Sequence, residues 1–280
     1  DLHKEYRRQR QDVYKRQALK NARQSIPASL MDALDKAATQ RHLLVATDFD
    51  GTLAPLVRNP RKAAPIPGSL EALDTLATIP HTKAAIVSGR DIAGLRKVAP
   101  VTRDVTLVGS HGAEISDSDH ELTKHQRDLL KRLIEEVTQT ADSIPGATIE
   151  EKKYAVVLHT RTAQDPHEAK KRTVELEERL SAVPGVTLTR GKKVSEFAVI
   201  NTTKDAALAS LAARWPTGAD AILYLGDDVT DEHIFTGLPA RITTPQTEII
   251  TVKVGEGDTA AQYRICLLYT SDAADDTPCV

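Results

Sequence analysis

The sequence predicts an α/β protein whose core is a doubly wound parallel sheet, interrupted by an inserted α+β domain. Three observations lead to this fold class. Short, continuous apolar runs alternate with helical stretches in the first part of the chain, and the same alternation returns in the last part. Between the two parts lies a pattern of helix, two strands, helix and two strands.

The first part begins with apolar residues at helical spacing and continues with apolar runs, each bounded by a turn former. Such continuous runs are typical of strands that are buried on both faces of a parallel sheet. Pro67 and Gly68 mark the start of the second helix, and Gly89 ends the second strand. The predicted elements are a helix at 29–40, a strand at 43–48, a helix to 77, a strand at 83–88, a helix at 91–98 and a strand at 105–108.

The middle part begins with a long amphipathic helix and contains a second, charged helix. We expect the helices at 121–141 and 165–182, and strands at 148–152, 155–160, 186–189 and 194–199. The last part returns to buried strands. Its predicted elements are a helix at 203–214, a strand at 221–225, a helix after Asp228, a strand at 249–254 and a short helix at 258–264.

These patterns predict a core domain in two segments, 18–115 and 201–265, with the inserted domain at 116–200. Residues 1–17 are polar and cationic, and residues 266–280 contain a run, CLLYTSDAADD, that resembles translated adapter read-through. We expect both ends to be disordered or artefactual tails.

Composition narrows the possible function classes. The 280 residues are 40% hydrophobic and 27% charged, with a formal net charge of −2, so no overall basic field favours nucleic acid. No apolar segment approaches the roughly 18 residues of a membrane span. Both cysteines lie near the end of the chain, so no disulfide framework is expected. We expect a cytoplasmic protein that binds neither nucleic acid nor membrane.

The motif DFDGTL places two carboxylates at the end of the first strand. Residues two apart in a strand point to the same side, so Asp48 and Asp50 can face one point beyond the carboxyl end of the sheet. A single aspartate at such a place is more often a helix cap or a turn former. A pair followed by Gly-Thr favours a chemical role.

A second acidic motif, GDDVTDE, follows a later apolar strand. Asp227 and Asp231 are four residues apart and would share one face of a helix. Converging carboxylates repel one another unless a cation lies among them, and oxygen ligands of this kind suit Mg²⁺. The alternative is a cluster that only caps the helix.

Two further places suit an anion. Ser88, Gly89 and Arg90 follow the second strand, where a hydroxyl and backbone N–H groups can hold phosphate. Lys204 precedes a helix and can supply a positive charge, although a lone lysine is more often a solvated surface residue.

Together, DFDGTL, Ser88, Lys204 and GDDVTD are similar to the four motifs of the haloacid dehalogenase superfamily of phosphotransferases. The spelling resembles the trehalose-6-phosphate phosphatase family more closely still. VSGR, GSHGAE, GKKVSE, GDDVTDE and VKVGEGDTAAQYRI occur in that family's order, and the resemblance covers about residues 43–265.

The resemblance implies a role for each motif residue. Asp48 would be the nucleophile that becomes an aspartyl phosphate, and Asp50 the general acid and base. Mg²⁺ would be bound by Asp48, the backbone carbonyl of Asp50 and Asp227, with Asp231 close by. Ser88 and Lys204 would hold the phosphoryl oxygens.

The inserted domain lies between Ser88 and Lys204, where the family has its larger cap. By resemblance, five charged residues would contact the disaccharide phosphate: Arg90, Glu150, Lys152, Arg161 and Glu196. The alternative is a merely charged cap surface. His111 and His159 are expected to be structural, because this chemistry needs no imidazole.

Two departures from the family are Asp205, where Gly is usual, and Ala198, where Arg is usual. An acid beside Lys204 could weaken its hold on phosphate.

The predicted function is therefore a Mg²⁺-dependent phosphatase that hydrolyses trehalose 6-phosphate to trehalose and phosphate, acting as a monomer. The alternatives are a phosphatase for another sugar phosphate, such as sucrose phosphate or a glycosyl phosphoglycerate, and an inactive sugar-phosphate sensor.

Overall fold

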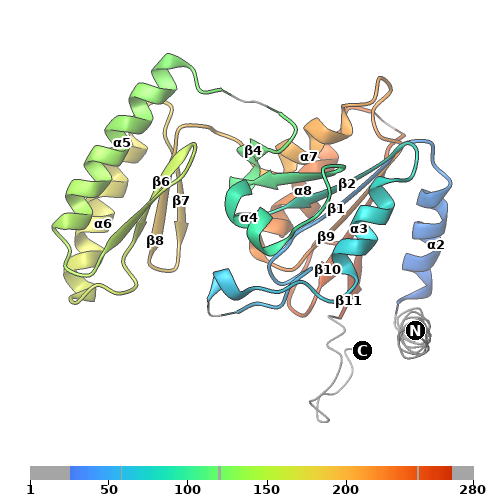
Figure 1. Ribbon diagram of the computed structural model, residues 1–280, viewed down its shortest axis with the longest axis horizontal. Coiled ribbons are helices and arrows are strands. Elements are labelled where there is room, and N and C mark those ends of the chain that lie inside the picture. Colours follow the sequence, from blue (N-terminus) through green and yellow to red (C-terminus); the bar gives the residue numbers. More distant parts are fainter. Residues whose placement is uncertain (1–25, 58, 119–120, 245, 267–280) are drawn as a thin grey trace, which may run out of the picture. The chain divides into compact units, whose positions relative to one another are not determined.

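The computed structural model describes residues 26–57, 59–118, 121–244 and 246–266, and the chain divides into two compact units (Figure 1). Within the described residues, the first unit comprises those up to Val87, those at Val98–Thr106 and those from Leu208 onward, and the second comprises those in Ser88–Lys97 and Leu107–Ala207. The predicted tails, 1–17 and 266–280, lie outside the described residues except for Cys266. The boundaries predicted at 115 and 200 stay predictions.

The larger sheet has seven strands in the order β11-β10-β9-β1-β2-β3-β4. Strand β1 pairs in parallel with β2 and β9, β10 pairs in parallel with β9 and β11, and β4 is antiparallel to β3. This arrangement confirms the predicted parallel sheet. The strands are β1 (Leu43–Thr47), β2 (Thr82–Val87), β3 (Val105–Gly109), β4 (Glu114–Ile115), β9 (Ala221–Gly226), β10 (Glu248–Val254) and β11 (Tyr263–Ile265).

Helices cover both faces of the sheet at β9, because successive side chains of a strand point to opposite faces. Ala221 packs in one apolar cluster with Leu30 of α2, whereas the ring of Tyr224 lies against Phe235 of α8, with ring centroids 6.1 Å apart. The sheet is therefore doubly wound. The helices associated with it are α2 (Ala28–Ala38), α3 (Ser69–Ala77), α4 (Ile92–Val98), α7 (Lys204–Ala212) and α8 (Val229–Arg241), with short 3-10 turns at η1 (Pro60–Lys62) and η2 (Ser110–Gly112).

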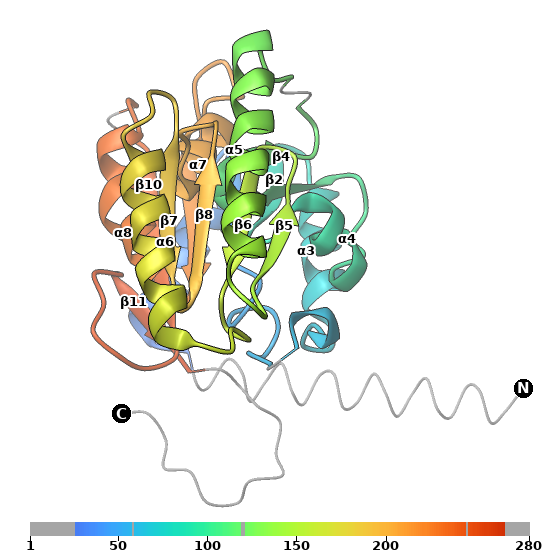
Figure 2. The same cartoon turned by 90° about the vertical axis from the view of Figure 1, so that its left-hand side faces the viewer.

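The second unit contains a four-stranded antiparallel sheet in the order β5-β6-β8-β7. Helices α5 and α6 cover one face of it (Figure 2) and share with it an apolar core that includes Leu133, Leu176 and Phe197. The predicted succession of one helix and two strands, repeated once, is thus confirmed. The elements are α5 (Lys124–Asp142), β5 (Thr148–Glu151), β6 (Ala155–His159), α6 (Pro166–Ser181), β7 (Thr187–Gly191) and β8 (Val194–Ala198).

Capping residues explain where these two helices begin. The Thr123 hydroxyl accepts a hydrogen bond from the Gln126 N–H, and the Gln126 side chain accepts one from the Thr123 N–H, which completes a capping box before α5. Asp165 accepts from the N–H groups of His167 and Glu168 before α6, with Pro166 at the first helical position.

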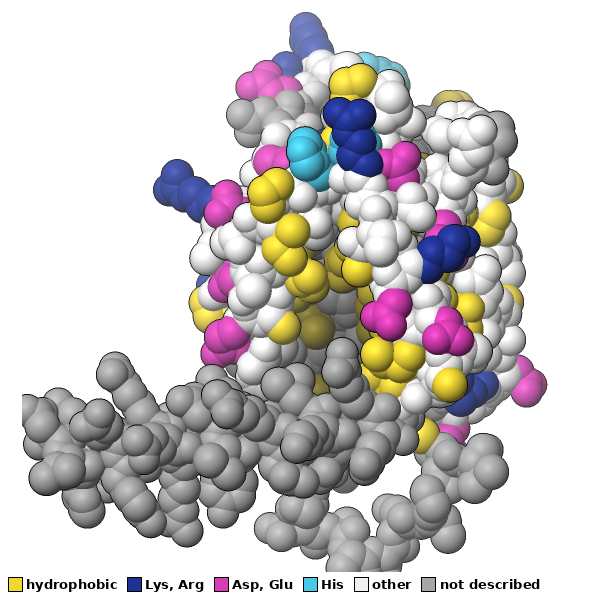
Figure 3. Space-filling model, turned by 90° about the vertical axis from the view of Figure 1, so that its right-hand side faces the viewer, with side chains coloured by type: hydrophobic (Ala, Val, Ile, Leu, Met, Phe, Trp, Pro, Cys, Tyr) yellow, Lys and Arg dark blue, Asp and Glu magenta, His cyan; other side chains and the backbone are white. Residues whose placement is uncertain are grey.

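Hydrophobic side chains lie along a hollow on the side of the molecule where α2 lies (Figure 3). The apolar cluster under α2 is accompanied by side chains that are only partly buried, namely Leu34, Leu43, Leu223, Leu225, Tyr263 and Ile265. Among the described residues, α2 therefore covers this face of the sheet only in part. No helix among these residues combines the length and hydrophobicity that a membrane crossing needs.

The helix predicted at 258–264 is wrong. The segment is an irregular loop that leads into β11, and Tyr263 and Arg264 pair with Val252 and Lys253 of β10. The Arg264 guanidinium donates hydrogen bonds to the carbonyl oxygens of Gly255 (2.6 Å) and Gly257 (2.5 Å). These contacts satisfy the loop's carbonyl groups without a helix, so pairing with β10 overrides the local helical pattern.

Candidate active site

The two acidic motifs meet at one edge of the larger sheet. Asp48 directly follows β1 and Asp227 directly follows β9, and these strands are parallel neighbours. The Asp48 N–H donates to the carbonyl oxygen of Leu225 at 2.8 Å, so the two strand ends are joined by a hydrogen bond. The strands after β1 in the sequence continue on one side of it with β2 and β3, and the later strands β9 and β10 lie on its other side. The strand order therefore changes direction at β1. Open α/β sheets bind ligands at such a switch point.

Three carboxylates converge there. Asp48, Asp227 and Asp231 each place a carboxylate oxygen within 4.8 Å of the other two. Asp48 and Asp231 are buried, with 5% and 0% of their surface exposed. Three acidic groups so close together repel one another in a shielded site, and a hard divalent cation with oxygen ligands would relieve the repulsion. The donor set therefore fits Mg²⁺.

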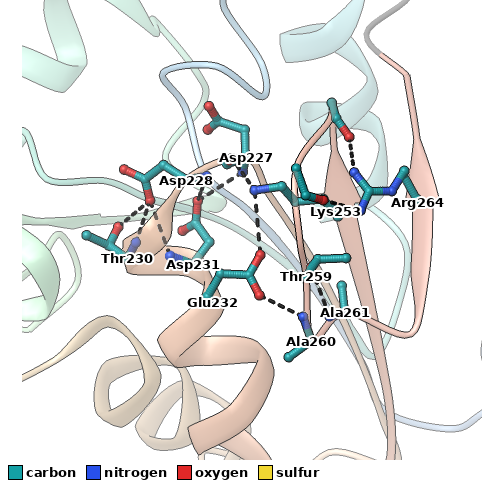
Figure 4. Close-up of polar contacts among 12 residues, drawn as sticks. Asp227, Asp228, Thr230, Asp231, Glu232, Lys253, Thr259, Ala260, Ala261 and Arg264 are labelled. Atoms are coloured by element: carbon teal, nitrogen blue, oxygen red, sulfur yellow. Dashed lines mark hydrogen bonds and ion pairs between the residues drawn. The ribbon is translucent and has the colours of Figure 1, made fainter. Parts of the chain in front are cut away.

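Both carboxylate oxygens of Asp231 accept hydrogen bonds. One of its carboxylate oxygens accepts from the Tyr224 hydroxyl at 2.7 Å. The other accepts from the N–H groups of Asp227 (3.0 Å) and Asp228 (3.2 Å) (Figure 4). Burial and the neighbouring carboxylates raise the pKa of Tyr224 well above its ordinary value, so the phenol keeps the proton that it donates. Asp231 thus orients the turn that carries Asp227.

The same turn begins helix α8. The Asp228 side chain accepts from the N–H groups of Thr230 (2.7 Å) and Asp231 (3.3 Å), which completes a capping box with Asp231. The capping role that the sequence left open for this motif is therefore real, but it belongs to Asp228 and Asp231. Asp227 is left to face Asp48.

The pKa of Asp227 is raised from 3.8 to about 6. Burial is the largest cause, and the charges of Asp231 and Asp228 add to it, because all three disfavour a further negative charge. The Thr52 hydroxyl, 3.4 Å from the carboxylate, and the Lys253 ammonium act in the opposite direction.

Two glycines leave room for these carboxylates. A Cβ on Gly51, whose φ is +92°, would lie 1.9 Å from Asp227 Oδ2. A Cβ on Gly226 would lie 2.4 Å from the Asp231 carboxyl carbon. The glycine of DFDGT is therefore required by close packing as well as by backbone conformation, and the glycine of GDD by close packing.

Asp50 lies in the tight turn after β1. Its neighbour Gly51 donates an N–H to the Ala54 carbonyl at 2.7 Å, and Asp50 and Ala54 form an isolated bridge. Its carboxylate is not one of the three that converge, and the expected metal contact through the Asp50 backbone carbonyl stays a prediction.

The predicted phosphate-binding residues belong to the second unit. The Ser88 N–H donates to the Val108 carbonyl (2.8 Å), and the Ser88 hydroxyl accepts from the Arg90 N–H (3.2 Å). Lys204 is the first residue of α7, and both Lys204 and Asp205 are buried, with 6% of each exposed. Lys204 is therefore shielded from bulk solvent and is not the solvated surface residue that a lone lysine usually is.

The predicted sugar-binding residues lie on the small sheet. Glu150 and Glu196 both lie opposite Val157, so their side chains point to the same face. Lys152 reaches that face too, because its Nζ lies 2.6 Å from Glu196 Oε2 with both side chains mostly buried. Glu150 pairs with His159 at 3.0 Å, and Arg161 lies exposed just beyond β6.

Sequence reasoning missed the residues that support Asp227, namely Tyr224, Glu232, Lys253 and the two glycines. One pattern could have pointed to Lys253. It is the only lysine within EIITVKV, an otherwise largely apolar strand, and a lysine in such a strand needs a partner.

Comparison with known proteins identifies a family. The trehalose-phosphatase family profile matches residues 46–266. An uncharacterized glycosyl hydrolase of Mycobacterium tuberculosis is 33% identical over 88% of this chain and 19% of its own length. A trehalose-phosphate phosphatase of Mycobacterium bovis is 33% identical over 70% of this chain and 51% of its own length. The chain thus spans about half or less of these relatives.

Among solved structures, the C-terminal domain of trehalose-6-phosphate phosphatase from Candida albicans is similar, with a TM-score of 0.64 and 25% identity over 83% of this chain and 90% of that one. The parallel sheet with acidic motifs at its switch point is the fold of the haloacid dehalogenase superfamily. Within that superfamily, the chain belongs to the trehalose-phosphatase family.

Proposed function

We propose that this chain is a phosphatase that hydrolyses trehalose 6-phosphate. The observation that supports this most strongly is the convergence of Asp48, Asp227 and Asp231 at the carboxyl edge of the sheet, inside the segment that matches the family. The Mycobacterium bovis relative is named a trehalose-phosphate phosphatase, which is why we choose this substrate over other sugar phosphates. The monomeric state and the cytoplasmic location stay predictions.

Asp48 is the nucleophile in this proposal. Its carboxylate oxygen attacks phosphorus, and the bond between phosphorus and the sugar oxygen breaks while an aspartyl phosphate forms. Asp50 gives its proton to the departing sugar oxygen. Asp50 then takes a proton from a water whose oxygen attacks phosphorus, and this step releases phosphate and restores the Asp48 carboxylate.

Asp48, the backbone carbonyl of Asp50 and Asp227 would hold Mg²⁺. When bound, the ion neutralises charge between the attacking carboxylate and the substrate phosphate. Asp231 acts indirectly in this scheme, because both of its oxygens already accept hydrogen bonds from Tyr224 and from the turn. It keeps the Asp227 side chain directed at Asp48.

Ser88 and Lys204 hold the phosphoryl oxygens in this proposal, as the resemblance implies. The residues that contact the sugar in this proposal are Arg90, Glu150, Lys152, Arg161 and Glu196. The polar face that carries Glu150, Lys152 and Glu196 supports this assignment, because sugar hydroxyls require charged and polar partners when they are buried.

The test is phosphate release from trehalose 6-phosphate, sucrose 6-phosphate, a glycosyl phosphoglycerate and glucose 6-phosphate, each with Mg²⁺ and with excess chelator. We expect the highest kcat/KM on trehalose 6-phosphate, and no activity with chelator. A preference for another sugar phosphate would overturn the substrate, and activity that is indifferent to chelator would overturn the metal. No turnover of any ester would favour a sugar-phosphate sensor.

A further inference from the structure

A buried lysine lies directly behind the acidic turn. Lys253 is on β10, opposite Gly226 of β9 in the parallel register, and only 5% of it is exposed. Its Nζ donates a hydrogen bond to the backbone carbonyl of Asp227. A buried ammonium group is costly unless it is paired, so its presence there requires an explanation.

Glu232 supplies the opposite charge. Its Oε1 lies 3.5 Å from Lys253 Nζ, is shielded from solvent and accepts no hydrogen bond from the described residues (Figure 4). Its Oε2 accepts a hydrogen bond from the Ala260 N–H at 2.8 Å. Glu232 therefore contacts Lys253 through one oxygen and the loop before β11 through the other. Lys253 in turn holds the backbone carbonyl of Asp227.

We propose that Lys253 is a positioning residue for the candidate metal site: held by Glu232, its ammonium fixes the Asp227 carbonyl and so directs the Asp227 carboxylate toward Asp48. The inference rests on the proposed function, because it assigns a task within the same site. Asp231 holds the N–H of Asp227 while Lys253 holds its carbonyl, so both sides of this residue are fixed. The lysine's positive charge also opposes the mutual repulsion of the three converging carboxylates.

A purely structural ion pair would predict a different outcome. Lys36 provides the matched control, because its Nζ lies 3.0 Å from Glu248 Oε1 and thus joins α2 to the same strand, far from the acidic turn in the fold. Replacing Lys36 removes a cross-element ion pair without touching Asp227. Loss of metal affinity that is specific to Lys253 would separate positioning from stability.

The experiment measures Mn²⁺ binding to the full chain by calorimetry, with the metal-free melting temperature recorded for each variant. We expect Lys253→Met to weaken Mn²⁺ binding by roughly 10- to 100-fold, the usual effect of removing a group that orients a metal ligand. Lys36→Met should leave it unchanged. We also expect the phosphatase activity of Lys253→Met to recover as Mg²⁺ is raised.

Lys253→Met that folds and binds Mn²⁺ as the wild type does would overturn the inference and leave the proposed function intact. If Lys253→Met does not fold, Glu232→Gln keeps an acceptor for Ala260 and removes only the charge that holds Lys253. Its Mn²⁺ affinity should then fall several-fold, and an unchanged value would be equally decisive. A wild-type chain that binds no Mn²⁺ would overturn both the metal site and this inference. A chain whose Mn²⁺ affinity falls in Lys253→Met but whose wild type releases no phosphate would overturn the function alone.

Discussion

At the scale of single residues, the acidic site depends on two glycines, because neither has a Cβ that would collide with a carboxylate. Gly51 has no Cβ, and the Asp227 carboxylate occupies the space that a Cβ would fill. The sequence shows a glycine in DFDGT but not the reason for it, since Asp227 is far away along the chain. The same reasoning applies to Gly226 and Asp231.

Gly51→Ala should displace Asp227 and weaken metal binding. Gly68→Ala is the matched control, because Gly68 has nearly the same φ, +87° against +92°, and nothing within 4 Å of its would-be Cβ. Both variants incur the backbone strain of a left-handed residue, about 1–2 kcal/mol. Only Gly51→Ala adds a clash. Urea unfolding and Mn²⁺ binding measure the difference, and equal losses in the two variants would show that the contact with Asp227 is unimportant.

Asp48→Asn should lower turnover by several orders of magnitude, because the amide keeps the shape of the carboxylate and removes the attacking charge. The chain should remain folded by circular dichroism. Trapping by beryllium fluoride, which mimics the phosphoryl group, should require Asp48. The exposed Asp32→Asn serves as the control and should behave as the wild type. Retention of more than about a tenth of the rate by Asp48→Asn would rule out the aspartyl-phosphate route.

At the scale of elements, the small sheet presents two different faces. One packs on α5 and α6, where the Ser195 hydroxyl donates to Glu177 Oε1 at 2.6 Å. The other carries Glu150, Lys152 and Glu196. The division follows from strand alternation, because Glu196 and Ser195 are adjacent residues and must point to opposite sides. Residues that bind the sugar are therefore expected on the face opposite α5 and α6.

Glu150→Ala and Glu196→Gln should impair hydrolysis of trehalose 6-phosphate and spare p-nitrophenyl phosphate, which has no sugar. Each lost charged hydrogen bond corresponds to roughly 1.5–3 kcal/mol, or about ten- to a hundred-fold in kcat/KM. Glu136→Gln, which removes an ion pair of 3.1 Å between α5 and α6, is the control and should affect neither substrate. Equal effects on both substrates would mean that this face does not bind the sugar.

At the scale of the whole molecule, the raised pKa of Asp227 links stability to pH and to metal. The folded value of about 6 lies above the ordinary value of 3.8, so ionisation of this carboxyl opposes folding when no metal is bound. Its stabilising contribution is full below about pH 4 and is lost as pH rises through about 6. A bound cation reverses the preference, because it binds the ionised form.

Mg²⁺ should therefore raise the melting temperature at pH 7.5, and the increase should shrink as the pH falls through about 6. A ligand at 100 times its dissociation constant stabilises the folded state by about 2.7 kcal/mol. Asp227→Asn, which cannot ionise at this position, should show little Mg²⁺-dependent increase in melting temperature at pH 7.5 or below about pH 6. Scanning calorimetry with and without Mg²⁺ provides the measurement, and an increase in Asp227→Asn as large as in the wild type would contradict the role of Asp227.

Sequence patterns alone predict most of the helices and strands in their order, the strand ends that carry Asp48 and Asp227, and the family. Those features are local: apolar runs, alternation and turn formers depend on neighbouring residues. Each acidic motif follows an apolar strand, so both are expected at the carboxyl edge of the sheet, and the family resemblance implies that Asp48 and Asp227 share one metal.

The remaining features depend on contacts between segments that are distant in the sequence. Residues 258–264 carry a local helical pattern, yet pairing with β10 and the Arg264 hydrogen bonds make the segment a loop and a strand. Lys253, Glu232 and Ala260 come together around the Asp227 turn from separate elements. A buried charge is acceptable only where a distant segment supplies its partner, and such partners are set by the packing of the chain rather than by the residues beside them.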